Sequence, residues 1–140
     1  MGARKRNMAI RLKEEKKDKS FASLNNCPSS PRKMRLVTEL IQGVEVKKAL
    51  DILKFTQKEP ARKVEKLLLS AISNWQAKNE GVRIEDSKLY VKEAFVEQGR
   101  TLKRLRTAPQ GRAHRIRKRS NHVTIILESL NKNESEINNK

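Results

Sequence analysis

The feature that most limits how this chain can fold is the basic segment LKRLRTAPQGRAHRIRKRS, residues 102–120, which holds eight lysines and arginines and no acid. Like charges at this density repel one another and oppose a compact fold. The segment is therefore expected to be either a disordered tail or a folded element that a polyanion completes. The residues on its two sides decide between these possibilities.

Both flanking segments have strand character. SKLYVKEAFVEQ, residues 87–98, and NHVTIILES, residues 121–129, are rich in β-branched and aromatic residues, and in places they alternate between apolar and polar side chains. They are expected to pair, so that the basic segment becomes the outer part of a β-hairpin over about residues 88–128. The tip of this hairpin is expected near residues 105–111.

A turn on APQG, residues 108–111, would close the hairpin, because proline and glycine stand where a type I turn favours them. This turn pairs Val96 with Val123 and Phe95 with Thr124. At about 3.3 Å per residue, the hairpin could project roughly 35 Å from its root to its tip.

Strand alternation distributes the basic side chains of the expected hairpin over both of its faces. It separates Lys103 from Arg104 and Arg106 on the first arm, and Lys118 from Arg115, Arg117 and Arg119 on the second. Both faces are therefore expected to bind anions, as they would if the hairpin ran between phosphate backbones. The alternative is a solvated basic loop.

The residue types indicate which nucleic acid would suit such a hairpin. Residues 100–120 contain no phenylalanine, tyrosine or tryptophan, so base stacking is not the expected mode of binding. The densest charge lies on a turn-bearing hairpin and not on a recognition helix, which argues against a helix-turn-helix reader. Arginine forks fit phosphate pairs in folded RNA, where shape and 2′-hydroxyls are recognised more than sequence.

Three amphipathic helices are expected between residues 30 and 81. Ser30 suits an N-cap, Pro31 the first helical position and Gly43 the stop of the first helix, while Pro60 and Gly81 bracket the third. The residues expected to face the core are Met34, Val37, Leu40 and Ile41 in the first helix, Val46, Ala49, Leu50 and Leu53 in the second, and Ala61, Val64, Leu68, Ala71 and Trp75 in the third.

These elements predict an α+β fold with three helices packed on a small antiparallel sheet and a long basic β-hairpin extension. The segment SFASLN, residues 20–25, supplies a further short strand. One domain is expected over residues 20–129. A mobile basic arm, residues 1–19, precedes it and a polar tail, residues 130–140, follows it.

The remaining composition excludes several classes of function. A net charge of +17, with 35% of the residues charged, calls for an anionic partner. No apolar run is long enough to span a membrane and no secretory signal is present, so a cytoplasmic location is expected. Cys27, His114 and His122 have no partners at metal-ligand spacing, and the carboxylates form no paired set. The sequence therefore predicts no enzyme, no cofactor, no metal and no small-molecule substrate.

Four segments resemble a known family. SPRKMRLVTELIQG, ALDILKFT, VEKLLLSAISN and LYVKEAFVEQGRTLKRLRTAPQGRAHRIRKRSNHVTIIL are similar to the large-ribosomal-subunit protein 22 family in its bacterial form. The likeness runs from about Phe21 to Glu128, and its most specific part is the pattern GRA-x-R-I-x-KR-[ST]-x-H-[IV]-T. The resemblance implies a globular domain at the surface of the large subunit and a hairpin that reaches through ribosomal RNA to the nascent-peptide exit tunnel.

The resemblance also implies roles for individual residues. The expected contacts with ribosomal RNA are Arg32, Lys33, Arg35, Lys103, Arg104, Arg106, Arg112, His114, Arg115, Arg117, Lys118 and Arg119. The expected tunnel-lining tip comprises Leu105, Arg106, Thr107, Ala108, Pro109, Gln110 and Gly111. This tip departs from the family, because RTAPQ stands at residues 106–110 where bacterial members commonly have Arg-Pro-Arg-Ala-Arg or Arg-Pro-Arg-Ala-Lys.

The sequence thus predicts a non-catalytic structural constituent of the large ribosomal subunit in the cytoplasm. Its expected partners are large-subunit ribosomal RNA, neighbouring ribosomal proteins and the nascent polypeptide, with no membrane partner. The alternative is a free-standing architectural or regulatory nucleic-acid-binding protein.

Overall fold

The computed structural model describes residues 2–79 and 87–130. Their elements follow in the order α1 (Gly2–Asp18), β1 (Ser20–Cys27), α2 (Pro31–Ile41), α3 (Val46–Phe55), α4 (Glu59–Lys78), β2 (Leu89–Thr107) and β3 (Ala113–Ser129). The predicted α+β class is confirmed, with α2, α3 and α4 at the expected places in the chain. The polar tail from residue 131 onward and Gly81 lie outside the described residues.

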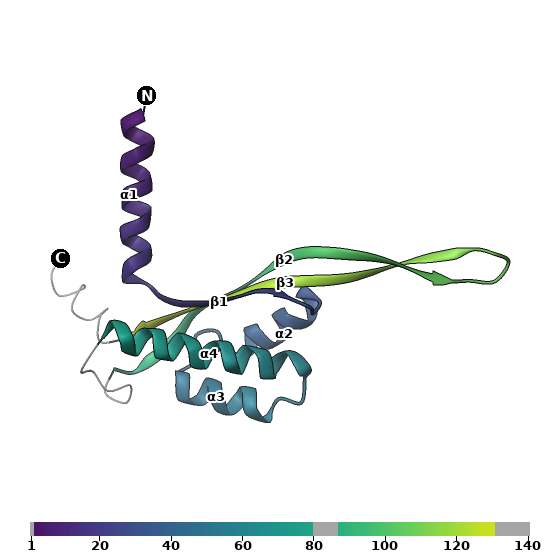
Figure 1. The fold of residues 1–140 in the computed structure, drawn as a ribbon. Coiled ribbons are helices and arrows are strands. Elements are labelled where there is room, and N and C mark those ends of the chain that lie inside the picture. The colour runs from purple at the N-terminus through teal and green to yellow at the C-terminus, as the bar shows by residue number, and fades with distance from the viewer. Residues whose placement is uncertain (1, 80–86, 131–140) are drawn as a thin grey trace.

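The three strands form one antiparallel sheet in the order β1-β3-β2, with β3 in the centre (Figure 1). Near the root of the hairpin Val96 pairs with Val123 and Phe95 with Thr124, which confirms the predicted register. On its other side β3 pairs with β1, where Ala22 lies opposite Ile125. Alternation along the inner part of β3, residues 121–129, directs its odd-numbered residues, such as Val123 and Ile125, inward.

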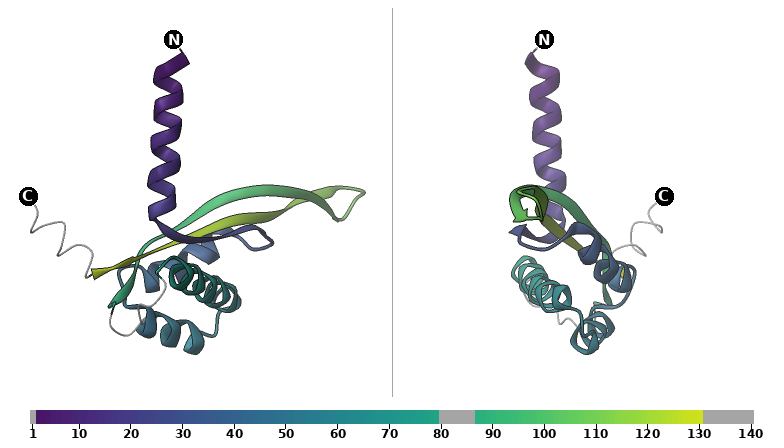
Figure 2. Two further views of the ribbon diagram at one scale, coloured as in Figure 1. Left: turned by 60° about the vertical axis from the view of Figure 1, so that its left-hand side comes forward. Right: turned by 90° about the vertical axis from the view of Figure 1, so that its right-hand side faces the viewer.

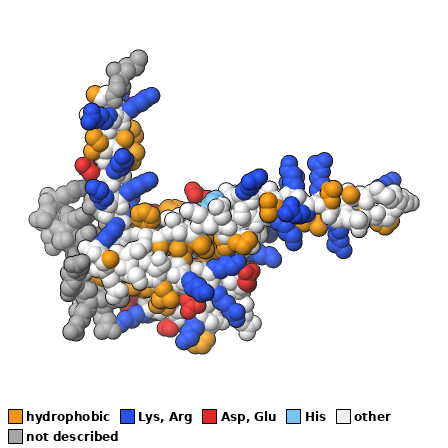
Figure 3. Space-filling view, viewed as in Figure 1, with side chains coloured by type: hydrophobic (Ala, Val, Ile, Leu, Met, Phe, Trp, Pro, Cys, Tyr) orange, Lys and Arg blue, Asp and Glu red, His pale blue; other side chains and the backbone are white. Residues whose placement is uncertain are grey.

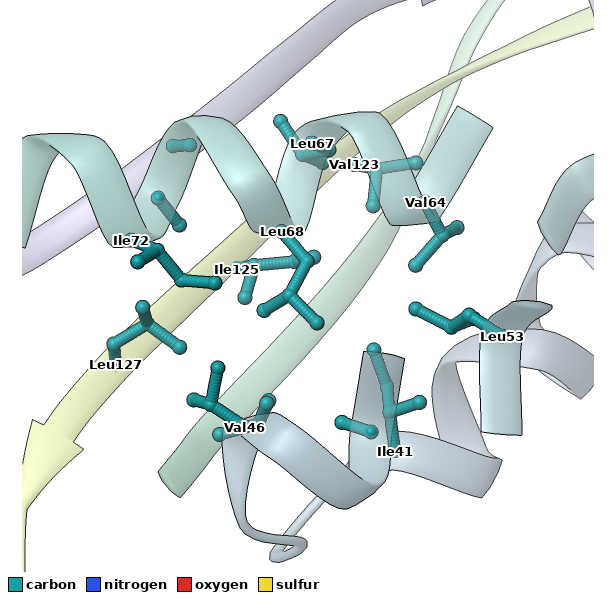
Figure 4. Packing of buried hydrophobic residues seen from close by; sticks show 14 of the residues in the cluster. Ile41, Val46, Leu53, Val64, Leu67, Leu68, Ile72, Val123, Ile125 and Leu127 are labelled. Atoms are coloured by element: carbon teal, nitrogen blue, oxygen red, sulfur yellow. The ribbon is translucent and has the colours of Figure 1, made fainter. Parts of the chain in front are cut away.

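Helices α2, α3 and α4 cover one face of the sheet, and the views in Figure 2 agree on this arrangement. Figure 4 shows Leu68 and Ile72 of α4 facing Ile125 and Leu127 of β3 across the core. Burying these aliphatic side chains stabilises the fold by roughly 1.5–3 kcal/mol for each large one. The core therefore joins the last strand of the chain to helices made much earlier.

The expected core positions are buried except Leu50, which is partly buried and packs against the core, and Leu40. Leu40 is 46% exposed, so the prediction that it faces the core is wrong. The buried face of α2 follows Met34, Val37, Thr38 and Ile41, and Leu40 lies about 60° beyond the edge of that arc at roughly 100° per residue. Thr38 occupies the inward position and donates its hydroxyl to the carbonyl of Arg35.

The loop between α2 and α3 protects the outer edge of β2. The amide of Gly43 donates to the carbonyl of Val91 at 2.8 Å, and the amide of Val91 donates to the carbonyl of Val44 at 3.0 Å. Gly43 has a φ of +77°, a conformation that glycine adopts without steric cost. This pairing holds the short helices against the root of the hairpin.

Residues 2–18 form α1, a helix that stands away from the rest of the fold on the side of the sheet opposite α3 and α4 (Figures 1 and 2). The sequence predicted a mobile arm here and did not predict a helix. The segment contains alanine, leucine, methionine, glutamate, lysine and arginine without an internal proline, and these residue types favour a helix. Whether the arm moves in solution stays a prediction.

Candidate nucleic-acid interface

A β-bulge separates the root of the hairpin from its outer part. Gln98 pairs with Asn121 and the next pair is Thr101 with Arg119, so two residues of β2 stand opposite Ser120 alone. The Ser120 hydroxyl donates to the carbonyl of Arg100 at 2.5 Å and closes the bulge. A glycine between polar residues in a strand was the signal that could have located this bulge.

The turn lies one residue later than predicted. The amide of Arg112 donates to the carbonyl of Pro109, with Gln110 and Gly111 between them at φ values of 61° and 69°. Positive φ at both central residues is the property of a type I′ turn, whose twist suits a hairpin. The predicted type I turn on residues 108–111 is therefore wrong. The bulge and the displaced turn compensate, so the root keeps the predicted register while the outer pairs shift by one residue.

Cross-strand pairing assigns the predicted RNA contacts to two faces of the outer hairpin, because directly opposite residues point to the same side. The first face carries Lys103, Arg115, Arg117 and Arg119, and the second carries Arg104, Arg106, His114 and Lys118. Figure 3 shows lysine and arginine side chains projecting from both sides of the hairpin. Arg112 stands beside the turn.

Like charges oppose one another directly on this hairpin. Lys103 is the pairing partner of Arg117, and like charges at opposite positions destabilise a strand pair. The nearest acids along the two arms, Glu97 and Glu128, lie at the root. No ion pair involves residues 99–120 within the part of the chain that the structure describes. Acids among the described residues therefore do not compensate the charge of the outer hairpin.

The tip differs from the basic arms. Leu105 is 72% exposed, and Thr107, Pro109, Gln110 and Gly111 are exposed too, while Ala108 is half-buried. Arg106 and Arg112 flank this neutral stretch. A neutral, protruding turn offers little attraction for phosphate compared with the arms behind it.

The structure also connects the three predicted contacts on α2 to the hairpin root. The buried side chain of Asn121 donates through Nδ2 to the carbonyl of Ser29 at 2.7 Å, which ties the start of α2 to β3. Arg35 donates a guanidinium N–H to the carbonyl of Val96 at 3.1 Å. Arg32 and Lys33, on the first turn of α2, are exposed. The basic start of α2 and the basic hairpin therefore share one root.

The two histidines differ in their surroundings. His122 accepts a hydrogen bond at Nδ1 from the amide of Asn26 at 3.1 Å, so it joins the end of β1 to β3. Asn26 has a φ of 54°, which asparagine tolerates better than most residues. His114 is exposed on the second face of the hairpin, opposite Arg106.

Other polar features lie away from the hairpin arms. A hydrogen bond from its ammonium to Glu128 at 2.8 Å raises the pKa of Lys92 above its ordinary value. A shallow depression of about 340 Å³ lies between α2 and β2 and is lined in part by Arg35, Glu39 and Phe95. Residues 2–79 and 87–130 contain no group of three metal-ligating side chains. None of their helices is long and apolar enough to cross a membrane.

Comparisons with known proteins match this architecture to one family. The family model described as Ribosomal protein L22p/L17e matches residues 22–128, which excludes α1. The chain is 61% identical over 135 residues to the large ribosomal subunit protein uL22 of Christiangramia forsetii, covering 96% of this chain and 100% of that protein. It is 60% identical to the protein of the same name from Flavobacterium johnsoniae, over 96% and 98% of the two chains. The chain is also 56% identical to the large ribosomal subunit protein uL22 of Bacteroides fragilis, over 97% of this chain and 99% of that protein.

The matched region contains the whole sheet except its outermost residues, the three packed helices and both arms of the hairpin. The family is a structural and non-enzymatic one. The chain therefore belongs to the ribosomal protein L22p/L17e family, as a bacterial structural constituent of the large ribosomal subunit.

Proposed function

We propose that the hairpin binds large-subunit ribosomal RNA along both faces and that its tip lines the nascent-peptide exit tunnel. The observation that carries the first part is the direct opposition of Lys103 and Arg117 on a hairpin that has no acid between Gln98 and Leu127. Such an arrangement is unfavourable in isolation and becomes favourable between phosphate groups. The same phosphates would hold the hairpin straight.

The shared root supports a second contact surface within the same site. Arg32 and Lys33 stand on the first turn of α2, where unpaired amides add a positive potential for phosphate. Asn121 fixes that turn relative to β3. Arg35 donates a hydrogen bond to the carbonyl of Val96, so part of its guanidinium helps to position α2 against β2.

Placement of the tip in the tunnel rests on the family together with the local composition. Residues 107–111 carry no charge and interrupt a basic run where the chain turns. A neutral turn held beyond a phosphate-binding shaft suits a passage through which peptides of varied charge must move. Neighbouring ribosomal proteins complete the proposed set of partners.

Salt dependence tests the RNA contact. Full-length protein binds large-subunit ribosomal RNA transcribed in vitro, and log affinity is followed against log KCl concentration. Replacing Arg115, Arg117 and Arg119 by glutamine should lower the slope by roughly two to three units, because each lost phosphate contact removes about 0.7–0.9. Replacing Lys54, Arg62 and Lys66, exposed residues on α3 and α4, removes equal charge and should change the slope by less than one unit.

If both triple variants lowered the salt slope equally, only net charge would matter and the hairpin would be removed from the proposal. The free-standing architectural alternative is tested separately by sedimenting a cell lysate in a salt-containing sucrose gradient. Co-migration of the protein with the large subunit is expected. A main pool that sediments with DNA or stays unbound would favour the alternative.

A further inference from the structure

We propose that α1 is a second RNA-binding arm, whose helix is held by phosphates along one basic face. The inference rests on the proposed function for the identity of its partner, since it takes large-subunit ribosomal RNA as the ligand of the whole protein. It concerns a different surface, because α1 lies outside the family match at residues 22–128.

The helix buries almost nothing. Every described side chain from residue 3 to residue 17 is exposed, including the apolar Met8, Ile10 and Leu12, which are 65%, 45% and 48% exposed. An isolated helix of 17 residues is marginal in water because nucleation is costly, and no packing among the described residues offsets that cost. A surface beyond the described residues is therefore needed to hold it.

The apolar residues do not form a stripe that could meet a protein groove or a membrane. At about 100° per residue, Ile10 lies roughly 160° around the helix from both Met8 and Leu12. Helices that dock in apolar grooves or on lipid collect their apolar residues on one side. Neither partner suits α1.

The charges are distributed unevenly, unlike the apolar residues. Five basic residues fall within an arc of about 120°. They are Lys5, Arg6, Lys13, Lys16 and Lys17. Arg4, Arg11 and Glu14 lie outside this arc. Among the described residues, none of the five makes an ion pair. We name these five residues the basic face of α1.

Repulsion within the basic face adds to the need for anions. Lys13 is three residues before Lys16 and four before Lys17, spacings at which like charges on a helix surface repel. A phosphate backbone beside the face reverses the sign of this interaction and releases condensed counterions. Basic segments that fold on RNA are stabilised in the same way, because phosphates offset the repulsion between their charges.

The root of α1 is fixed by the globular part. The ammonium of Lys78, at the end of α4, donates to the carbonyl of Lys17 at 2.9 Å and also to the carbonyl of Lys19. A cation at the C-terminal end of α1 complements the helix dipole there. Because α1 and the hairpin leave the sheet in different directions (Figure 1), they would reach two separate segments of RNA.

Two matched double variants test this role in the full-length protein with the in vitro transcribed large-subunit RNA. Arg6→Gln with Lys13→Gln changes the basic face, and Arg4→Gln with Arg11→Gln changes the other side, with the same spacing of seven residues and the same loss of charge. The first pair should lower the salt slope by about one to two units and the second by less than half a unit. Amides of residues 3–17 should become protected from exchange when RNA is added.

Equal slopes for the two pairs, or no protection of residues 3–17 on RNA, would overturn the inference. Protection that appears only in intact subunits would assign α1 to a protein neighbour and would also overturn it. The hairpin triple variant separates the two proposals. If the hairpin variant lowers the slope while the Arg6→Gln, Lys13→Gln pair does not, only the proposal for α1 is rejected. If the hairpin variant leaves the slope unchanged, the proposed hairpin contact is rejected.

Discussion

Gly99 on β2 lies so close to Ser120 on β3 that a Cβ added to the glycine would stand 2.8 Å from the Ser120 hydroxyl oxygen. The same atom would lie 3.1 Å from Nε2 of His122 and 3.2 Å from the backbone carbonyl carbon of Ser120. The serine hydroxyl is engaged with the carbonyl of Arg100, so moving it away also costs a hydrogen bond. The bulge at the hairpin root therefore requires a residue without a side chain.

We expect Gly99→Ala to lower the free energy of unfolding by about 1–3 kcal/mol, because the added methyl group overpacks the bulge. Urea denaturation followed by circular dichroism measures this change. Gly111→Ala is the control, since no atom lies within 4 Å of its added Cβ and the cost is backbone strain at the tip. An unchanged midpoint for Gly99→Ala would show that the two strands separate easily at the bulge.

Asn121→Ala should destabilise the protein by about 1–3 kcal/mol, because the buried carbonyl of Ser29 loses its donor. Thermal unfolding measures the effect. Asn74→Ala removes a hydrogen bond of the same kind, from Nδ2 to the carbonyl of Phe21, at an exposed position and should cost less than about 0.5 kcal/mol. Similar losses for the two variants would mean that burial at the hairpin root adds nothing.

In the free protein, amides of residues 101–119 should exchange with solvent much faster than those of residues 121–129. The outer arms bury few side chains and oppose like charges, whereas the inner part of β3 lies between two strands over the core. Hydrogen exchange by NMR measures both regions in one sample. Protection of the outer arms without RNA would contradict the electrostatic explanation of the hairpin.

The tip should be close to nascent chains in assembled ribosomes. A photocrosslinker at Ala108 is expected to capture nascent peptide, and one at Thr101 on the first face of the hairpin is expected to capture RNA. Deleting residues 107–110 should leave subunit assembly largely intact and alter peptide-dependent pausing. Crosslinks from Ala108 only to RNA, with failed assembly of the deletion, would reassign the tip to RNA anchoring.

The two strands of the hairpin root could be predicted from their β-branched, aromatic and alternating residues, whereas their register at pairs such as Val96 and Val123 was derived from the turn placed on residues 108–111. The register of the outer arms could not be predicted. Gln110 adopts a positive φ, which glutamine rarely does, and Gly99 gives only a weak signal for a bulge. Each of these moves one strand by a single residue. They cancel at the root, so the correct inner pairs followed from a turn placed one residue too early.

Prediction of α1 failed for a different reason. Helix assignment from sequence relies on apolar periodicity, and α1 has none, because within residues 2–79 and 87–130 nothing packs against its described side chains. The basic contacts could be named from residue type and family resemblance, whereas their grouping on two faces depends on the cross-strand pairs. The hydrogen bond from Arg35 to the carbonyl of Val96 could not be predicted, because it depends on how α2 packs against β2.

The central position of β3 affects the order of events during synthesis. Both edge strands depend on the strand that is made last, and the contact of Ser20 with Leu127 joins residues 107 positions apart. A chain that stops before residue 113 therefore exposes two strands without a partner, a state that favours wrong pairing and degradation. Because the sheet closes only after β3 has been made, truncated products cannot form the hairpin root and cannot replace the complete protein in assembly.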